Sequence, residues 1–173
     1  MGYICRQAVA QQEQGAEILD INVGIPGANE EELMKKVVAA VRSVSDLPLQ
    51  IDSSDPAAIE AGLRLAGGRS IVNSVNGKEE SLTAVLPIVK KYGAVVVGLT
   101  LDENGIPETS EGRVSIAKKI IARCEAAGIP RENIAVDCLT MTVGVDPENP
   151  KITLDALSEV KKLGAKTVLG VSN

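Results

Sequence analysis

The sequence contains no histidine, tryptophan or phenylalanine, and its aromatic side chains are limited to Tyr3 and Tyr92. Without an imidazole, the chain cannot supply a histidine base, a histidine zinc ligand or a Ser-His-Asp triad. It also lacks the aromatic platforms on which single-strand nucleic-acid readers stack bases. The net charge of −5, from 18 basic and 23 acidic residues, has the wrong sign for binding a phosphate backbone. We therefore expect no nucleic-acid partner.

Long apolar runs are absent too, since no stretch approaches the ~20 residues that a membrane helix needs. The first ten residues lack the charged-then-apolar pattern of a signal peptide, so a cytoplasmic protein with no membrane partner is expected. Cys5, Cys124 and Cys138 are odd in number and show no C-x-x-C spacing. This pattern predicts reduced structural thiols, and argues against a disulfide framework or a zinc ribbon.

The sequence does contain a repeated alternation of short β-branched apolar runs and longer amphipathic segments. Asn29 and Asp55 stand at expected helix N-caps, and Pro56 stands at a first helical position. Strands that are apolar on both faces and alternate with helices predict an α/β fold with a parallel sheet. Strands are expected at 18–23, 49–52, 70–73, 94–100, 134–137 and 166–171, and helices at 4–14, 30–44, 56–65, 79–91, 111–127 and 154–163.

Polar side chains gather at the carboxyl ends of nearly all of these strands. They are Asp20, Asn22, Asp52, Asn73, Thr100, Asp102, Asp137, Ser172 and Asn173. In a (β/α)₈ barrel such ends ring one pocket, whereas in an open sheet they spread along an edge. So many contributors favour the barrel. One Asp or Asn alone is more often a cap or a turn former, but this set suits an organic ligand rich in N–H and C=O groups.

Six segments at these strands resemble the pterin-binding methyltransferases. They are residues 17–24 (EILDINVG), 50–54 (QIDSS), 71–74 (IVNS), 92–107 (YGAVVVGLTLDENGIP), 136–140 (VDCLT) and 169–173 (LGVSN). The nearest group is the methyltetrahydrofolate:corrinoid/iron–sulfur protein methyltransferases. More distant relatives are the folate domain of cobalamin-dependent methionine synthase and dihydropteroate synthase. The resemblance implies a (β/α)₈ TIM barrel that holds the pterin of 5-methyltetrahydrofolate at its strand ends.

The resemblance also implies which residues bind the pterin. Asp52, Asn73 and Asp137 look like the residues that hydrogen-bond its amino-pyrimidine edge. Carboxylates suit the N–H donors of that edge, and an amide suits a part of the edge that carries both hydrogen-bond donors and acceptors. Asp20 and Asn22 lie where the family places supporting polar groups.

The closing Gly-Val-Ser-Asn motif supplies the remaining site residues that the resemblance implies. Gly170 and Ser172 are expected to contact the substrate, and Asn173 resembles the asparagine that approaches the pterin N5. A tertiary amine is a poor leaving group, so N5 must be protonated or strongly hydrogen-bonded as its methyl leaves. In this family the methyl goes to the Co(I) of a corrinoid on a separate protein. The implied partners are that corrinoid (iron–sulfur) protein, the folate and, by resemblance, a second copy in a homodimer.

The chain is shorter than the roughly 250 residues of such a barrel. We expect residues 1–173 to form a single partial domain with about strands 2 to 7, without the first strand and the last helix-strand-helix. An open barrel exposes strand edges. We therefore expect a chain that is unstable, self-associated or completed by another polypeptide.

Other functions remain open at this point. A dihydropteroate synthase-like enzyme shares the pterin pocket, but its loop after the Asp137 strand differs from the sequence found here. Asp20, Asp52 and Asp137 form an oxygen-only set that a magnesium ion accepts, although the interleaved amides suit an organic ligand better. A Schiff-base aldolase is disfavoured because Lys166 begins a strand. A non-catalytic folate-binding module is the alternative from another functional class.

Overall fold

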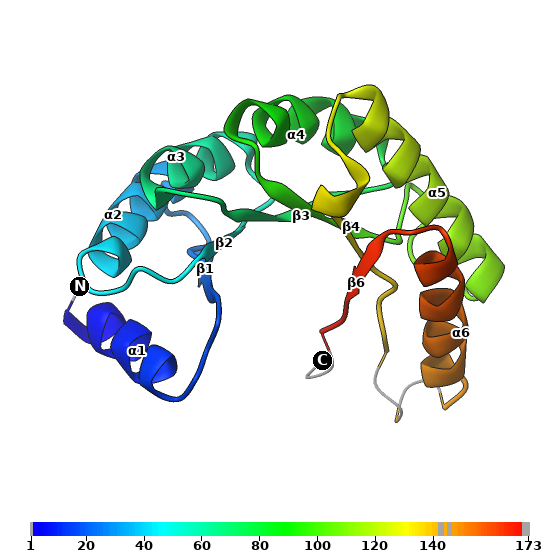
Figure 1. Cartoon of the computed structure of the whole chain (residues 1–173), viewed down its shortest axis with the longest axis horizontal. Helices are drawn as coiled ribbons and strands as arrows, with labels where there is room; N and C mark the ends of the chain where they lie inside the picture. The colour runs from blue at the N-terminus through cyan, green and yellow to red at the C-terminus, as the bar shows by residue number, and fades with distance from the viewer. Residues whose placement is uncertain (1, 142–143, 145–146, 171–173) are drawn as a thin grey trace. The chain divides into compact units, whose positions relative to one another are not determined.

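The computed structural model of the chain describes residues 2–141, 144 and 147–170, in which strands and helices alternate as the sequence predicts (Figure 1). The elements are α1 (Gly2–Glu13), β1 (Leu19–Asn22), α2 (Glu30–Arg42), β2 (Leu49–Asp52), α3 (Pro56–Ala66), β3 (Ile71–Asn76), α4 (Glu79–Tyr92), β4 (Val95–Leu99), α5 (Ser110–Ala126), a 3₁₀ turn (Arg131–Asn133), β5 (Ile134–Asp137), α6 (Asn149–Lys162) and β6 (Lys166–Val168). They divide between unit 1, residues 1–73 and 91–95, and unit 2, residues 74–90 and 96–173.

Unit 1 contains a parallel sheet in which β1, β2 and the first half of β3 pair in sequence order. Its strands bury one face, represented by Leu19, Ile21, Ile51 and Val72. Helix α3 packs so closely on β2 that a Cβ atom at Gly62 would lie 2.9 Å from Ile51 Cγ2. The alternation of side chains along each strand leaves the other face for polar residues.

The predicted helix starts in unit 1 are confirmed. Asn29 Oδ1 accepts from Glu32 N at 3.0 Å and caps α2. Asp55 Oδ1 accepts from Ala57 N at 2.9 Å and caps α3. These two side chains satisfy helix N–H groups that have no partner within the helix. They therefore serve the helices and not a ligand.

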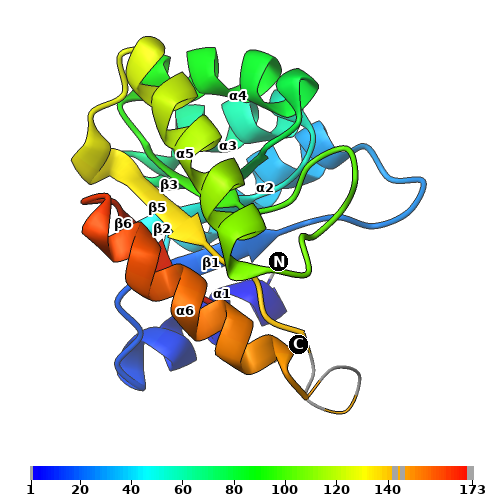
Figure 2. The same cartoon turned by 90° about the vertical axis from the view of Figure 1, so that its right-hand side faces the viewer.

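Unit 2 contains β4, β5 and β6, which also pair in parallel and in sequence order. Helix α5 packs against β4 where a Cβ atom at Gly98 would lie only 2.8 Å from Ile120 Cγ2. Figure 2 shows α5 and α6 side by side along β5 and β6, and the two helices are in contact. Among the described helices, none is both long and apolar enough to cross a membrane.

Three element ends differ from the sequence prediction by three or more residues. Helix α6 begins at Asn149 and not at 154, because Pro150 is tolerated in the first turn, where its missing N–H has no intrahelical acceptor. Strand β3 continues to Asn76, which places Asn73 inside the strand. Strand β6 ends at Val168, before the predicted end at 171.

Candidate functional site

Three of the predicted site residues form one row across the sheet of unit 1. The parallel register aligns Asn22 of β1 with Asp52 of β2, and Asp52 with Asn73 of β3. The bond from Ser53 N to Asn73 O, 2.9 Å long, continues this ladder past the end of β2. Residues level in a parallel ladder point to the same face, here the face opposite the buried Ile51. The structure thus brings an amide, a carboxylate and a second amide together.

A hydrogen-bond chain fixes how this row is oriented. Gly24 N donates to Asn22 Oδ1 at 3.0 Å, and Asn22 Nδ2 donates to Asp52 Oδ2 at 2.9 Å. Since the oxygen of the Asn22 amide is held by a backbone donor, its NH₂ group must face Asp52. Within the described part of the chain, this bond engages one carboxylate oxygen of Asp52 and leaves the other available to a ligand.

A second polar row lies two residues earlier along the same strands. Gln50 Nε2 donates to Asp20 Oδ1 at 2.7 Å, and the register pairs these two residues across β1 and β2. Desolvation raises the pKa of the Asp20 carboxyl above its ordinary value; the Gln50 bond opposes that rise and the nearby Asp52 charge adds to it. Gln50 was missed from the sequence, although its place two residues before Asp52 signals that both share a face.

Asp20 and Asn22 also line a cavity of about 400 Å³ beside β1. Apolar side chains from α1 and α2, among them Ile4 and Leu33, form much of its wall, and Gly24 lies at its border. A pocket that is mainly apolar and carries a few convergent polar groups is the usual form of a small-molecule site. The two residues expected to support the site are therefore themselves accessible to a ligand.

Asp137 ends β5 in unit 2, level with Leu99 of β4 and Val168 of β6. Its Oδ1 accepts from Leu139 N at 2.7 Å. Burial raises the pKa of the Asp137 carboxyl, while backbone hydrogen bonds from Leu139 and Gly170 work against the rise. Asp137 is thus a partly desolvated carboxylate held in place by backbone donors.

Two other residues of the predicted strand-end set have local structural roles. Thr100 is fully buried, and its hydroxyl donates to the backbone oxygen of Asp137 at 3.2 Å. Asp102 Oδ1 accepts from Asn104 N at 2.8 Å in a tight turn. These contacts give both side chains a structural role in the segments that follow β4 and β5.

The end of the chain carries the remaining predicted site residues. Gly170 is described and exposed, and it interacts with Asp137 through its backbone. Ser172 and Asn173, the expected catalytic residue, lie outside the described residues. Unit 1 therefore holds the Asp20, Asn22, Asp52 and Asn73 positions, and unit 2 holds Asp137 and Gly170.

A buried cation in unit 2 was not anticipated from the sequence. Arg113 of α5 is fully buried, and its guanidinium donates to the backbone oxygens of Cys138 and Leu139. A signal was present, because 113 falls on the same helical stripe as the apolar Ile116, Ala117 and Ile120. An arginine at such a core position is rarely placed there by chance, since a charge is costly to bury without partners.

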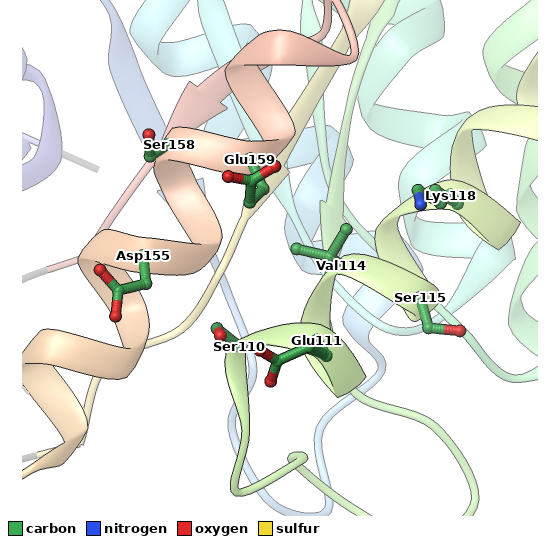
Figure 3. A pocket seen from close by; sticks show the side chains of 8 residues that line it. All are labelled: Ser110, Glu111, Val114, Ser115, Lys118, Asp155, Ser158 and Glu159. Atoms are coloured by element: carbon green, nitrogen blue, oxygen red, sulfur yellow. The ribbon is translucent and has the colours of Figure 1, made fainter.

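Another cavity, of about 540 Å³, lies in a groove between α5 and α6 (Figure 3). Its lining is mainly polar: Ser110, Glu111, Val114, Ser115, Lys118, Asp155, Ser158 and Glu159. None of the predicted site residues lines it. Its mixed charges are typical of the solvated sides of two neighbouring surface helices, so size alone does not make it the site.

Metal and thiol chemistry receive little support from the described residues. In that part of the chain, no three His, Cys, Asp or Glu side chains converge as a metal site would require. Burial raises the pKa of Cys124 to about 12 and that of Cys138 to about 11. The thiolate is the reactive form, so both thiols are unreactive and structural, as expected.

Comparison with known proteins decides the family. The model of the family described as "Pterin binding enzyme" matches residues 3–173 of this chain. The chain belongs to this family. With the relatives described next, this match confirms the resemblance of the six strand segments to pterin-binding methyltransferases.

Two relatives of this chain are named as enzymes, and one of the two is named as a methyltransferase. Methionine synthase of Mycobacterium leprae is 35% identical over 94% of the chain, which covers 14% of that protein. Methylcorrinoid:tetrahydrofolate methyltransferase of Eubacterium limosum is 28% identical over 91% of the chain, which covers 60% of that protein. The chain thus spans less than two thirds of the length of either relative.

A solved structure establishes the fold of this pterin-binding chain. Dihydropteroate synthase from Thermus thermophilus superposes with a TM-score of 0.79 at 23% identity, over 96% of the chain and 66% of that structure. At this identity the likeness speaks for the fold alone. It confirms the predicted α/β fold, with parallel strands that alternate with helices as in part of a (β/α)₈ barrel.

Proposed function

We propose that this chain binds the pterin of 5-methyltetrahydrofolate and transfers its N5 methyl group to the Co(I) of a corrinoid carried by a partner protein. The observation that carries the proposal is the row of Asn22, Asp52 and Asn73, level on three neighbouring strands. A relative named for methyl transfer between a corrinoid and tetrahydrofolate supports the reaction class.

The row matches the polarity of a pterin edge. Asp52 offers a carboxylate oxygen to ring and amino N–H donors, and charge-assisted bonds of this kind are about twice as strong as neutral ones. Asn73 is level with Asp52 and offers both a donor and an acceptor to a mixed edge. In the proposal, Asp137 of unit 2 also accepts hydrogen bonds from the pterin, and Leu139 N sets the orientation of its carboxylate.

The methyl transfer itself requires little covalent chemistry from the protein. The pterin N5 loses its methyl as the electron pair of the C–N bond returns to nitrogen, and the cobalt of the corrinoid substrate attacks the methyl carbon with its own electron pair. A donor at N5 stabilises the departing amine, and Asn173 is proposed for that role. The buried thiols are not needed, which agrees with their raised pKa values.

The name of the Eubacterium limosum relative pairs methylcorrinoid with tetrahydrofolate, the opposite direction of transfer. The same site serves both directions, because the groups that stabilise a transition state do so whichever way it is crossed. The direction in a cell then depends on the free energies of the methylated partners. We also propose, from family resemblance, that the active form is a homodimer, which sedimentation of the purified chain tests.

The decisive experiment separates binding from turnover. The chain is titrated with tetrahydrofolate by calorimetry, and methyl transfer from 5-methyltetrahydrofolate to Co(I) cobalamin is followed by absorbance. Asp52→Ala is the site variant, and Glu111→Ala, in the groove between α5 and α6, is the matched control. The proposed enzyme activity is supported if the wild-type chain binds tetrahydrofolate and transfers the methyl group, if Asp52→Ala abolishes both, and if Glu111→Ala retains both.

Each alternative has its own result in this experiment. Binding without transfer supports a folate-binding module. Condensation of a pterin diphosphate with 4-aminobenzoate, run in parallel, supports a dihydropteroate synthase-like enzyme. An absence of pterin binding by the folded chain overturns the proposal.

A further inference from the structure

We propose that Arg113 is a positioning residue for the pterin site: its bonds to the carbonyl oxygens of Cys138 and Leu139 hold the two peptide units that flank Leu139, so that the Leu139 N–H group orients the carboxylate of Asp137. This inference rests on the proposed function for its consequence in binding, and on contacts within unit 2 for its geometry. Thr153 of α6 is the second member of this arrangement, because its hydroxyl lies between the guanidinium and the carbonyl oxygen of Leu139.

The guanidinium ties together the segments that follow β4 and β5. Arg113 Nε donates to Pro107 O at 3.0 Å, between β4 and α5. Its Nη1 donates to Cys138 O at 3.0 Å and to Leu139 O at 2.7 Å, directly after β5. A planar fork of several donors can make such contacts at once, whereas the single ammonium group of a lysine cannot copy their geometry.

The position of Arg113 in its helix points to this role. It is the fourth residue of α5, near the positive end of the helix dipole, where a cation is disfavoured. It is also fully buried, in a helix whose other fully buried positions are small or apolar. A cation at this position stabilises neither the helix nor the core. The contacts of Arg113 with the segments after β4 and β5 therefore account for its presence.

Leu139, between the two carbonyl groups that Arg113 contacts, is in a conformation that needs support. Leu139 has φ of +57°, the one described non-glycine residue with a positive φ. For a leucine this left-handed conformation costs free energy, because its Cβ atom approaches the following carbonyl oxygen. The bond from Arg113 and the 2.8 Å bond from Thr153 Oγ1, both to Leu139 O, offset that cost.

This conformation matters because it turns the Leu139 N–H group back onto Asp137, whose Oδ1 accepts at 2.7 Å. With its carbonyl released, Leu139 returns to an ordinary φ and its N–H group leaves the carboxylate. Asp137 then loses one of the two backbone donors that oppose the effect of its burial. The chain of contacts therefore runs from Arg113 through Leu139 to the carboxylate proposed to bind the pterin.

The test measures the Leu139 amide directly and tetrahydrofolate binding separately. Arg113→Met keeps the length of the side chain but removes every donor. Thr153→Val keeps the shape and removes the hydroxyl, and Thr153→Ser is its matched control because it restores the hydroxyl. We expect fast hydrogen exchange of the Leu139 amide in the first two variants and slow exchange in the wild type and Thr153→Ser. Thermal unfolding shows which variants are folded under the assay conditions.

Tetrahydrofolate affinity then shows whether Arg113 acts through Asp137. Arg113→Met is expected to weaken binding about tenfold, the effect of about one hydrogen bond to a charged group. In an Asp137→Asn background the same substitution is expected to change affinity less than about twofold, since the charged acceptor is already gone. In Arg113→Met, a further Leu139→Gly substitution is expected to recover much of the loss, since glycine adopts the positive φ without strain.

The outcomes distinguish this proposal from the proposed function. A Leu139 amide that stays protected in folded Thr153→Val and Arg113→Met overturns the positioning role, whatever the ligand. Equal losses of affinity in the wild-type and Asp137→Asn backgrounds overturn it as well. If the wild-type chain does not bind tetrahydrofolate, the proposed function fails, and the exchange of the Leu139 amide still decides whether Arg113 positions that peptide.

Discussion

The orientation of the Asn22 amide makes a sharp prediction for the substitution Asp52→Asn. Because Gly24 N holds Asn22 Oδ1, the Asn22 NH₂ group always faces position 52. An asparagine at 52 must then turn its own oxygen toward Asn22 and its NH₂ group toward the ligand. The variant thus presents a donor to the pterin N–H groups where the wild type presents an acceptor.

The expected magnitude follows from the bond that is lost. Hydrogen bonds to charged groups contribute about 1.5–3 kcal/mol, so Asp52→Asn is expected to weaken tetrahydrofolate binding about 10- to 150-fold. Asn22→Ala removes a single supporting bond to Asp52, 2.9 Å long. At about 1 kcal/mol this single substitution is expected to weaken binding about fivefold.

The double variant is the informative one. Without the Asn22 amide, an asparagine at 52 is free to turn its oxygen toward the pterin. We therefore expect Asn22→Ala to improve binding in the Asp52→Asn background, although it weakens binding in the wild type. A reversal of sign of this kind cannot arise from two independent sites, whose effects add.

Calorimetric titration of the four proteins with tetrahydrofolate measures this coupling, with thermal unfolding as the check on folding. Additive losses, or a double variant that binds more weakly than Asp52→Asn alone, would refute the reasoning that Asn22 imposes the orientation of residue 52.

Three further predictions concern stability and turnover. The raised pKa of Asp20 means that its contribution to stability is fully present below pH 3.8 and is lost as the pH rises through the folded-state value. The stability of Asp20→Asn relative to the wild type, from denaturant unfolding, should therefore increase as the pH rises from 3.8 toward neutrality; a constant difference would contradict this. Gly98→Ala, whose Cβ would lie 2.8 Å from Ile120 Cγ2, should lower the free energy of unfolding by about 1–3 kcal/mol. An unchanged midpoint of denaturant unfolding would show that the neighbouring side chains shift to make room for the added methyl group. Asn173→Ala should slow methyl transfer more than it weakens folate binding, and equal losses of the two would remove it from the role at N5.

Much of the fold was predictable because it depends on local patterns. The strands at 49–52 and 134–137 have the predicted bounds, and Asn29 and Asp55 cap the predicted helices. Short β-branched runs, amphipathic periodicity and cap residues are all properties of neighbouring residues. The start of α6 was predicted late because Pro150 was taken as the end of a loop, whereas a proline also fits a first helical turn.

The candidate site was predictable only as a set of residues. Asp52, Asn73 and Asp137 were recognised from strand ends and from family resemblance. Their partners were not, because Gln50 meets Asp20, and Arg113 meets Leu139, across long separations in sequence. Such pairs depend on strand register and on how a helix packs, which no local pattern specifies.

Composition and periodicity thus account for the class of fold, for the lack of imidazole chemistry in this chain and for the proposal that Asp and Asn side chains bind the ligand. The tertiary structure adds which of these groups are level with one another and which way each one points. Asn22 faces Asp52 because a backbone N–H at Gly24 holds its oxygen, and Asp137 is oriented by a strained leucine that α5 and α6 hold in place. Orientation of this kind comes from hydrogen bonds that form only when the strands are in register and the helices are packed.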